Sequence, residues 1–244
     1  MSSHRHAFNI GLNVGGMVLP MLVGVLTVPG LLQRLGQEKF GVLALGWALV
    51  GYFGFLDLGM GRALTQYLAS ADQAGVSRQE QATVACAARR LLGGLSLGMA
   101  LLLWLLLPWL ASFVQMPADL RAQTLATTPL LALAVPLAMW FACSTGVLEA
   151  RSRFAVVNSV RIPTGVGNFV APWLVSLFTA DLFWVIASLL VVRLAGALGM
   201  AWWARPEFAQ PAPRWPSAGI RQLLRFGGWM TVSNLIGPVM SYFD

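Results

Sequence analysis

The chain has 244 residues, of which 57% are hydrophobic and 10% are charged, and its mean hydropathy is +0.71. Soluble domains carry about 25% charged residues, so this composition excludes an ordinary soluble enzyme, a disordered chain and a secreted disulfide scaffold. The 16 Lys and Arg against 9 Asp and Glu give a formal net charge of +7 and a pI near 10.7. A pI this high is typical of nucleic-acid binding when the basic residues share one surface.

Seven long blocks of the chain carry almost no charge. They are residues 7–33, 41–56, 91–118, 122–148, 162–180, 182–204 and 226–243. A transmembrane helix needs about 20 predominantly apolar residues. The blocks are too long for barrel strands and lack their period-two alternation, and the first block is too long for the apolar part of a signal peptide. The sequence therefore predicts an all-α, polytopic integral membrane protein.

The basic residues are sorted between alternate gaps. Twelve of the 16 fall in one set of gaps: Arg5, Arg62, Arg78, Arg89, Arg90, Arg151, Arg153, Arg161, Arg205, Arg214, Arg221 and Arg225. The other gaps hold only Arg34, Lys39 and Arg121, and Arg193 lies inside a block. By the positive-inside rule, the richer side, which includes the N-terminus, is predicted to be cytoplasmic. Topology then explains the charge, and we expect no nucleic-acid partner.

The blocks divide the chain into three parts. Residues 1–204 are predicted to form a six-helix transmembrane lobe, residues 205–222 a cytoplasmic Pro-rich linker, and residues 223–244 a seventh helix that opens a second lobe. A weak repeat, in which Pro238 aligns with Pro20, agrees with this division. The organisation is that of an apparent fragment of a two-lobe membrane protein, and we expect the gene product to continue beyond Asp244.

No enzyme motif stands out. The sequence lacks a Walker-type phosphate loop, a His-Glu-x-x-His segment and a Cys-x-x-Cys pair, and its two histidines, His4 and His6, lie near the N-terminus. Cys86 and Cys143 are expected on the cytoplasmic side, reduced and packed in the protein. We therefore expect a protein that is not an enzyme and that has no cofactor or metal site.

Arg193 is the clearest candidate for a functional residue. It lies about eleven residues, or roughly 16 Å, from the external end of its predicted helix, where an ionisable side chain is costly unless it meets a partner or a wet cavity. It either lines a substrate path, pairs with Asp57, or extends along the helix to the inner surface. Asp57 and Arg62, in the segment GFLDLGMGRALTQYLA, are further candidates, with a structural salt bridge as the alternative.

Other polar residues mark the cytoplasmic mouth and two bendable helices. Asn158 and Arg161 belong to a basic cluster between the fourth and fifth helices, where Arg161 could reach an anionic headgroup. Asn13, with nearby glycines and Pro20, makes the first predicted helix polar and bendable, as in helices that line a cavity. Asn13, Asn158 and Arg161 complete the set of candidate cavity residues.

Three stretches carry a resemblance to a known family. Asn13, Pro20, Gly36, Phe40 and Gly41, followed by LDLGMGRALTQYLA, resemble the start of the bacterial oligosaccharide flippases of the multidrug/oligosaccharidyl-lipid/polysaccharide exporter superfamily. GVLEARSRFAVVNSVRIPTGVGNFVAPWLV is similar to the family's fourth-to-fifth helix region, and RFGGWMTVSNLIGPVMSYFD to its seventh helix.

The resemblance implies a fold and a function. The fold would be two six-helix lobes around a cavity that opens alternately to each side of the bacterial inner membrane. The substrate would be an undecaprenyl-pyrophosphate-linked sugar repeat unit, moved to the periplasmic leaflet for polysaccharide biosynthesis, with cavity arginines binding the pyrophosphate and an ion gradient as the energy source. A polysaccharide polymerase and a chain-length regulator are candidate partners.

Two alternatives remain open. A drug or cation exporter of the same superfamily would favour acidic residues over Arg193 in the cavity. A membrane polymerase or ligase acting on polyprenyl-linked sugars would need a large external loop with clustered His, Arg or carboxylates, which the sequence does not contain.

Overall fold

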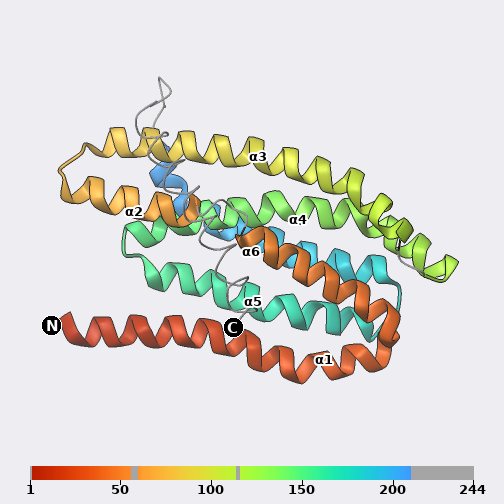
Figure 1. Cartoon of the computed structure of the whole chain (residues 1–244). Coiled ribbons are helices and arrows are strands. Elements are labelled where there is room, and N and C mark those ends of the chain that lie inside the picture. Colours follow the sequence, from red (N-terminus) through yellow and green to blue (C-terminus); the bar gives the residue numbers. More distant parts are fainter. Residues whose placement is uncertain (1, 56–59, 114–115, 210–244) are drawn as a thin grey trace, which may run out of the picture.

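The computed structural model describes residues 2–55, 60–113 and 116–209, with α1 side chains described at positions 15, 16 and 18–48. This part of the chain consists of helices and connections without strands, which confirms the all-α prediction. The helices are α1 (Ser2–Phe55), α2 (Met60–Gln73), α3 (Arg78–Phe113), α4 (Ala118–Ala150), α5 (Phe154–Ser176) and α6 (Leu182–Phe208), and they form one elongated bundle (Figure 1).

The long element α1 combines the first two predicted helices. Figure 1 shows it running from the N-terminus to the far end of the bundle and then turning back. Gly36 makes the turn with a φ of 77° and a ψ of 165°, a backbone conformation that only glycine adopts readily. The expected connection around residue 37 is therefore present as a one-residue break in the helix.

Four stretches of the described chain are long and apolar enough to cross a membrane. They are Val18–Ala48, which contains the turn at Gly36, and the helices α3, α4 and α6. The 36 residues of α3 span roughly 54 Å at 1.5 Å per residue, well beyond about 30 Å of hydrocarbon. The helix begins at Arg78, 13 residues before the apolar block that predicts it, because its first turns lie where charge is tolerated.

The bundle is organised around α4. This helix packs on α6, α3, α2, α1 and α5, while α5 lies between α1 and α6. Two apolar cores hold the two ends: one contains Leu64, Leu68, Val84, Cys143 and Val147, and the other Leu31, Leu43, Leu182 and Ile186. Both cysteines are buried and neither forms a disulfide, and the Cys86 thiol donates to the carbonyl of Phe208 at 3.5 Å.

Glycines allow the helices of the bundle to approach closely. A Cβ added at Gly146 of α4 would collide with the backbone carbonyl of Gly61 on α2, and one at Gly165 of α5 would lie 2.7 Å from Pro20 of α1. A Cβ added at Gly196 of α6 would likewise lie 2.5 Å from the side chain of Thr164 on α5. Small residues at such contacts take the place of apolar side chains in membrane helix packing.

The connections alternate between the two ends of the bundle. The turns α2–α3 and α4–α5 and the end of α6 lie at the same end as the N-terminus, which we call the N-terminal end. Gly36 and the α5–α6 connection lie at the opposite end, where the Lys39 ammonium donates to the Ala180 carbonyl at 2.9 Å. The described arginines that the sequence assigns to the cytoplasmic gaps therefore lie toward one end of the bundle, as the positive-inside rule requires.

The domain division is only partly covered by the described residues. Helix α6 ends at Phe208, so residues 205–208, placed in the linker from the sequence, continue a helix with Pro206 inside it. Residues 210–222 of the linker and the seventh helix lie outside the described part. The three-part division stays a prediction.

Candidate functional site

Arg193 lies on the inward face of α6. Buried residues of this helix recur in steps of three and four, and Leu189, Arg193 and Ala197 fall on one stripe. The Arg193 Nε is buried and has no hydrogen-bond partner in the described structure, and no carboxylate there pairs with the guanidinium. Asp57, its partner in one of the alternatives left open by the sequence, lies outside the described residues. Arg193 is thus a cation in the interior of the bundle without a neutralising charge among the described residues.

The packing of α5 against α6 fixes the level of Arg193. Val192 of α6 lies against Gly167 of α5, and Thr164 of α5 lies against Gly196 of α6. The two helices are therefore antiparallel, and Arg193 lies at the same level as Gly167. Asn168 follows Gly167, and its buried Oδ1 also has no hydrogen-bond partner in the described structure. Two polar side chains with unused hydrogen-bonding capacity therefore stand at one level of the bundle.

Arg161 stands closer to the N-terminal end on α5. It is six residues, or roughly 9 Å of helix, from the level of Gly167. Its Nη2 donates to Glu149 Oε1 of α4 at 2.6 Å, and both side chains are partly exposed. The basic cluster expected here is thus partly neutralised by Glu149, a residue that the sequence reasoning did not select.

Asn158 faces α1 from the same helix. It is 1% exposed, and its Oδ1 would lie 3.1 Å from a Cβ at Gly16. Because residues three apart share a helix face, Asn158 and Arg161 face the same side of α5. Because Gly16 has no side chain, α1 packs closely against the polar face of α5 at this position.

The remaining predicted residues are not brought into this group. Arg62 is exposed on α2, while its neighbour Gly61 and Thr65 face α4, where the Thr65 hydroxyl donates to the Gly146 carbonyl at 3.0 Å. Asn13 lies within α1, but its side chain is outside the described part, as is Asp57. Roles for Asn13, Asp57 and Arg62 stay predictions.

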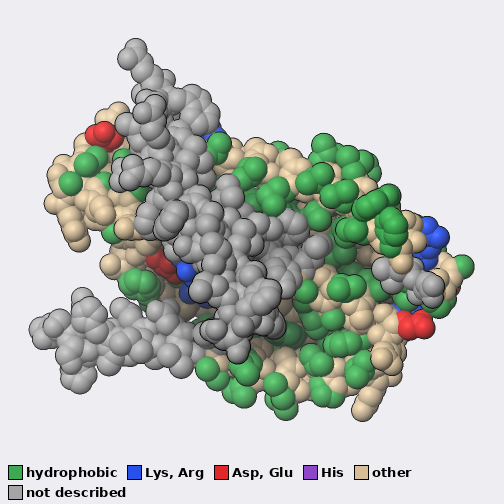
Figure 2. Space-filling model, viewed as in Figure 1, with side chains coloured by type: hydrophobic (Ala, Val, Ile, Leu, Met, Phe, Trp, Pro, Cys, Tyr) green, Lys and Arg blue, Asp and Glu red, His purple; other side chains and the backbone are tan. Residues whose placement is uncertain are grey.

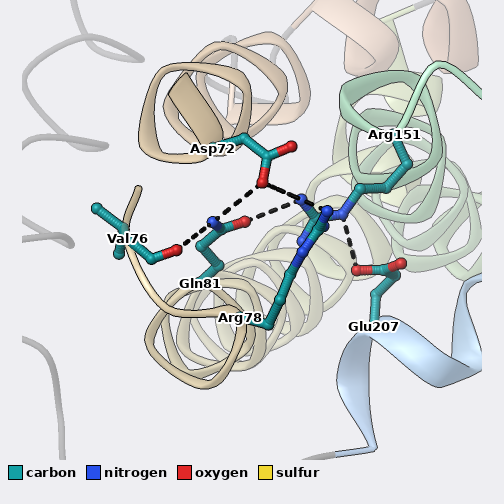
Figure 3. A network of polar contacts seen from close by, with 6 residues as sticks. All are labelled: Asp72, Val76, Arg78, Gln81, Arg151 and Glu207. Atoms are coloured by element: carbon teal, nitrogen blue, oxygen red, sulfur yellow. Dashed lines mark hydrogen bonds and ion pairs between the residues drawn. The ribbon is translucent and has the colours of Figure 1, made fainter. Parts of the chain in front are cut away.

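A second polar network closes the N-terminal end (Figure 3). The Arg151 side chain is 9% exposed; its Nε donates to Glu207 at 2.9 Å and its Nη1 to Gln81 at 2.9 Å. Asp72 forms ion pairs with both Arg151 and Arg78, with N···O distances of 3.6 and 3.4 Å. Gln81 also donates to the Val76 carbonyl at 2.8 Å. These residues tie the ends of α2, α3, α4 and α6 together, so Arg151 has a structural role.

The described residues contain no group of three His, Cys, Asp or Glu side chains able to hold a metal ion. We call Asn158, Arg161 and Asn168 of α5, together with Arg193 of α6, the α5–α6 track. Its chemistry is that of guanidinium cations and side-chain amides. Such groups bind and orient an anion, and they do not supply a paired acid and base.

Solved transporters share this fold. A MOP superfamily transporter from Pyrococcus furiosus, reported with a binding pocket of reverse polarity, superposes with a TM-score of 0.73 at 16% identity, over 96% of this chain and 54% of that one. A crystal structure of MATE in complex with Br-NRF superposes with a TM-score of 0.68 at 16% identity, over 98% of this chain and 55% of that one. The described bundle therefore has the fold of one half of these transporters.

The family follows from the sequence. The model of the polysaccharide biosynthesis protein family matches residues 7–244, and the chain belongs to this family. A Shigella flexneri protein named "Putative O-antigen transporter" is 28% identical over 232 residues, which are 95% of this chain and 55% of that protein. The chain spans about half the length of these relatives. The resemblance seen in the sequence is confirmed.

Proposed function

We propose that the protein containing this chain moves undecaprenyl-pyrophosphate-linked oligosaccharide repeat units from the cytoplasmic to the periplasmic leaflet of the bacterial inner membrane. The chain would supply the N-terminal lobe of an alternating-access transporter, with its N-terminal end cytoplasmic and an ion gradient as the energy source. It would act as a transporter, without a catalytic step, and hand its substrate to a polysaccharide polymerase and chain-length regulator.

The observation that carries this proposal is the uncompensated Arg193 inside a chain of this family. An isolated ionised side chain at mid-membrane costs about 2.5–3.5 kcal/mol or more. An anion that visits the site offsets this cost, and a pyrophosphate is a strong partner for a guanidinium. Asn168 at the same level adds an unpartnered amide oxygen that can accept from a sugar hydroxyl.

The polarity of the site bears on the two alternatives. A drug or cation exporter would be served by an unpaired carboxylate on this track, and Glu149, which contacts the track, is already paired with Arg161. A polymerase or ligase would need clustered acids and bases, and the described part of the track offers none. Both observations favour an anionic cargo carried without chemistry.

The test starts from a strain in which the full gene is deleted. We expect lipid-linked repeat units to accumulate in the cytoplasmic leaflet and surface polysaccharide to disappear. The amount of polymer restored by Arg193→Gln should be lower than that restored by wild type by a factor of about ten or more. The reason is that a hydrogen bond to a charged group contributes about 1.5–3 kcal/mol. Arg121→Gln, which removes an exposed arginine at the opposite end, is the matched control.

Three outcomes would contradict the proposal. Deletion could leave polysaccharide intact and instead sensitise the cells to cationic drugs, which would favour the exporter. Arg193→Gln could complement as well as wild type at equal protein level. Finally, a cysteine at position 193, in a Cys86→Ala, Cys143→Ala background, could stay inert to membrane-impermeant maleimide from both sides, which would remove Arg193 from an aqueous path.

A further inference from the structure

A groove between α3 and α4 lies outside the proposed substrate path. It has a volume of about 400 Å³, within the range of about 300–1,000 Å³ that is common for ligand pockets. Its walls are mostly apolar, with Leu97 on α3 and Pro136 and Trp140 on α4. Gly93 leaves its floor open, because a Cβ there would meet nothing within 4 Å.

Two arginines stand at one end of this groove. Arg89 and Arg90 lie one helical turn before Gly93, on the side of the N-terminal end. The Arg89 guanidinium lies 4.4 Å from the centre of the Phe208 ring, and Arg90 is exposed. Neither arginine has an ion pair or side-chain hydrogen bond within the described part of the chain. The groove therefore combines an apolar trough with an uncompensated positive end.

A second hollow continues the positive end on the other side of Arg89. Its volume is about 570 Å³, and Arg205 and Trp202 line it, with the Arg205 guanidinium 4.8 Å from the Trp202 ring. Among the described residues, no carboxylate lines either hollow. By contrast, the hollow at Arg78 and Arg151 is lined by Asp72 and Glu207 as well. The protein neutralises the arginines of its inner network, whereas no described carboxylate pairs with Arg89, Arg90 or Arg205.

The surroundings place this end of the groove at a membrane boundary. Arg90 is the last charged residue before the apolar part of α3, whose Leu97, Leu101 and Trp104 side chains are exposed. In Figure 2 hydrophobic side chains cover the region of α3 toward the right of the view, while the visible charges lie in the left part and at the right end. Trp202 is exposed beside Arg205, as is typical of side chains at headgroup level.

We propose that the α3–α4 groove binds an anionic glycerophospholipid from the leaflet at the N-terminal end of the bundle. One acyl chain lies in the trough over Gly93 and along Leu97 and Pro136, and the phosphate is held by Arg89 and Arg90. Arg205 extends the positive surface toward a second phosphate or headgroup. Basic pockets between membrane helices bind anionic lipids in this manner, through a charged headgroup site joined to an apolar chain site.

The commitment to a bilayer lipid rests on the complementarity of both parts. A free phosphate would use the arginines and leave the trough empty. A neutral phospholipid would use the trough and leave the arginine charge uncompensated. Only an anionic lipid satisfies the two parts together. The groove lies against exposed lipid-facing side chains of α3, whereas the proposed cargo path follows α5 and α6.

The test measures lipid retention by the purified full-length protein. Native mass spectrometry after titration with dioleoyl phosphatidylglycerol or dioleoyl phosphatidylcholine gives the binding ratio of the two lipids. We expect wild type to prefer phosphatidylglycerol. The Arg89→Gln, Arg90→Gln double variant should lose about fivefold in this preference per arginine, or roughly twenty-fivefold in all. Arg121→Gln, which removes one positive charge at the other end of the bundle, should keep it.

A second variant tests the trough with both arginines in place. Gly93→Leu fills the floor of the groove without meeting a neighbour at Cβ, and it should lower retention of both phospholipids at this site severalfold. The proposal is overturned if wild type retains the two lipids equally, or if Arg121→Gln loses as much preference as the double variant. It is also overturned if the site takes polyprenyl pyrophosphate and not phosphatidylglycerol, since the groove would then belong to the cargo.

Discussion

Removal of Arg151 is expected to loosen the N-terminal end of the bundle. The Arg151 guanidinium donates to Glu207 and Gln81 at 2.9 Å each, from a side chain that is 9% exposed. Hydrogen bonds to charged groups contribute about 1.5–3 kcal/mol each. Glu207 is 23% exposed, so water partly replaces its lost partner, and we expect Arg151→Met to lower the free energy of unfolding by about 2–3 kcal/mol.

Thermal unfolding of the purified protein in detergent would measure this effect. For 150–250 residues, 1 kcal/mol corresponds to about 2–4 °C, so the midpoint should fall by roughly 5–10 °C. Arg78→Gln breaks the exposed ion pair with Asp72 and should lower the free energy of unfolding by no more than about 1 kcal/mol. Arg151→Lys should fall between the two, because an ammonium does not reproduce the planar set of donors.

A double-mutant cycle separates the network from the loss of a single arginine. Arg151→Met and Glu207→Gln should together cost less than the sum of the two single changes, since each removes the same contact. Strict additivity, or an Arg151→Met midpoint equal to that of Arg78→Gln, would refute the assignment of Arg151 as the centre of the network.

Three further outcomes are expected from single substitutions. Gly146→Ala, which drives a methyl group into the backbone of α2, should destabilise by about 1–3 kcal/mol in the same unfolding assay, whereas Gly94→Ala, in open space, should be neutral or stabilising. Gly36→Ala should cost about 1–2 kcal/mol because of the positive φ at the turn; an unchanged midpoint would contradict this. In the polysaccharide assay, Arg161→Gln should lower export while Glu149→Gln, which leaves the cation in place, should not; equal losses would indicate that the ion pair is purely structural.

The apolar blocks predicted the helices well because burial in lipid leaves a signal in local composition. The interruptions at residues 34–39 and the sorting of arginines placed the turns at the correct ends of the bundle relative to one another. Helix ends were less well predicted: the first turns of α3 and the last turn of α6 are charged, so a hydropathy criterion stops short of them. Helices that project beyond hydrocarbon need a different signal, such as amphipathic spacing.

The candidate site was predicted only where a single residue carries the information. Arg193 is anomalous in its own block, so its interior position followed from the sequence. The partners of Arg151 and Arg161 did not, because Gln81 lies 70 residues from Arg151 and Glu207 lies 56 residues from it. Asn168 was missed since an uncharged amide in a Gly-rich helix is a weak signal until packing shows that its oxygen lacks a partner.

The central place of α4 has a consequence for biogenesis. Within the described residues, α1 makes little or no contact with α2 or α3, and α2 touches α3 only lightly, while all three pack on α4. As the chain emerges from the ribosome, the earlier helices enter the bilayer before the surface that unites them has been made. Insertion of α4 is then the step that joins α2 and α3, whereas α1 makes its larger contact only when α5 follows.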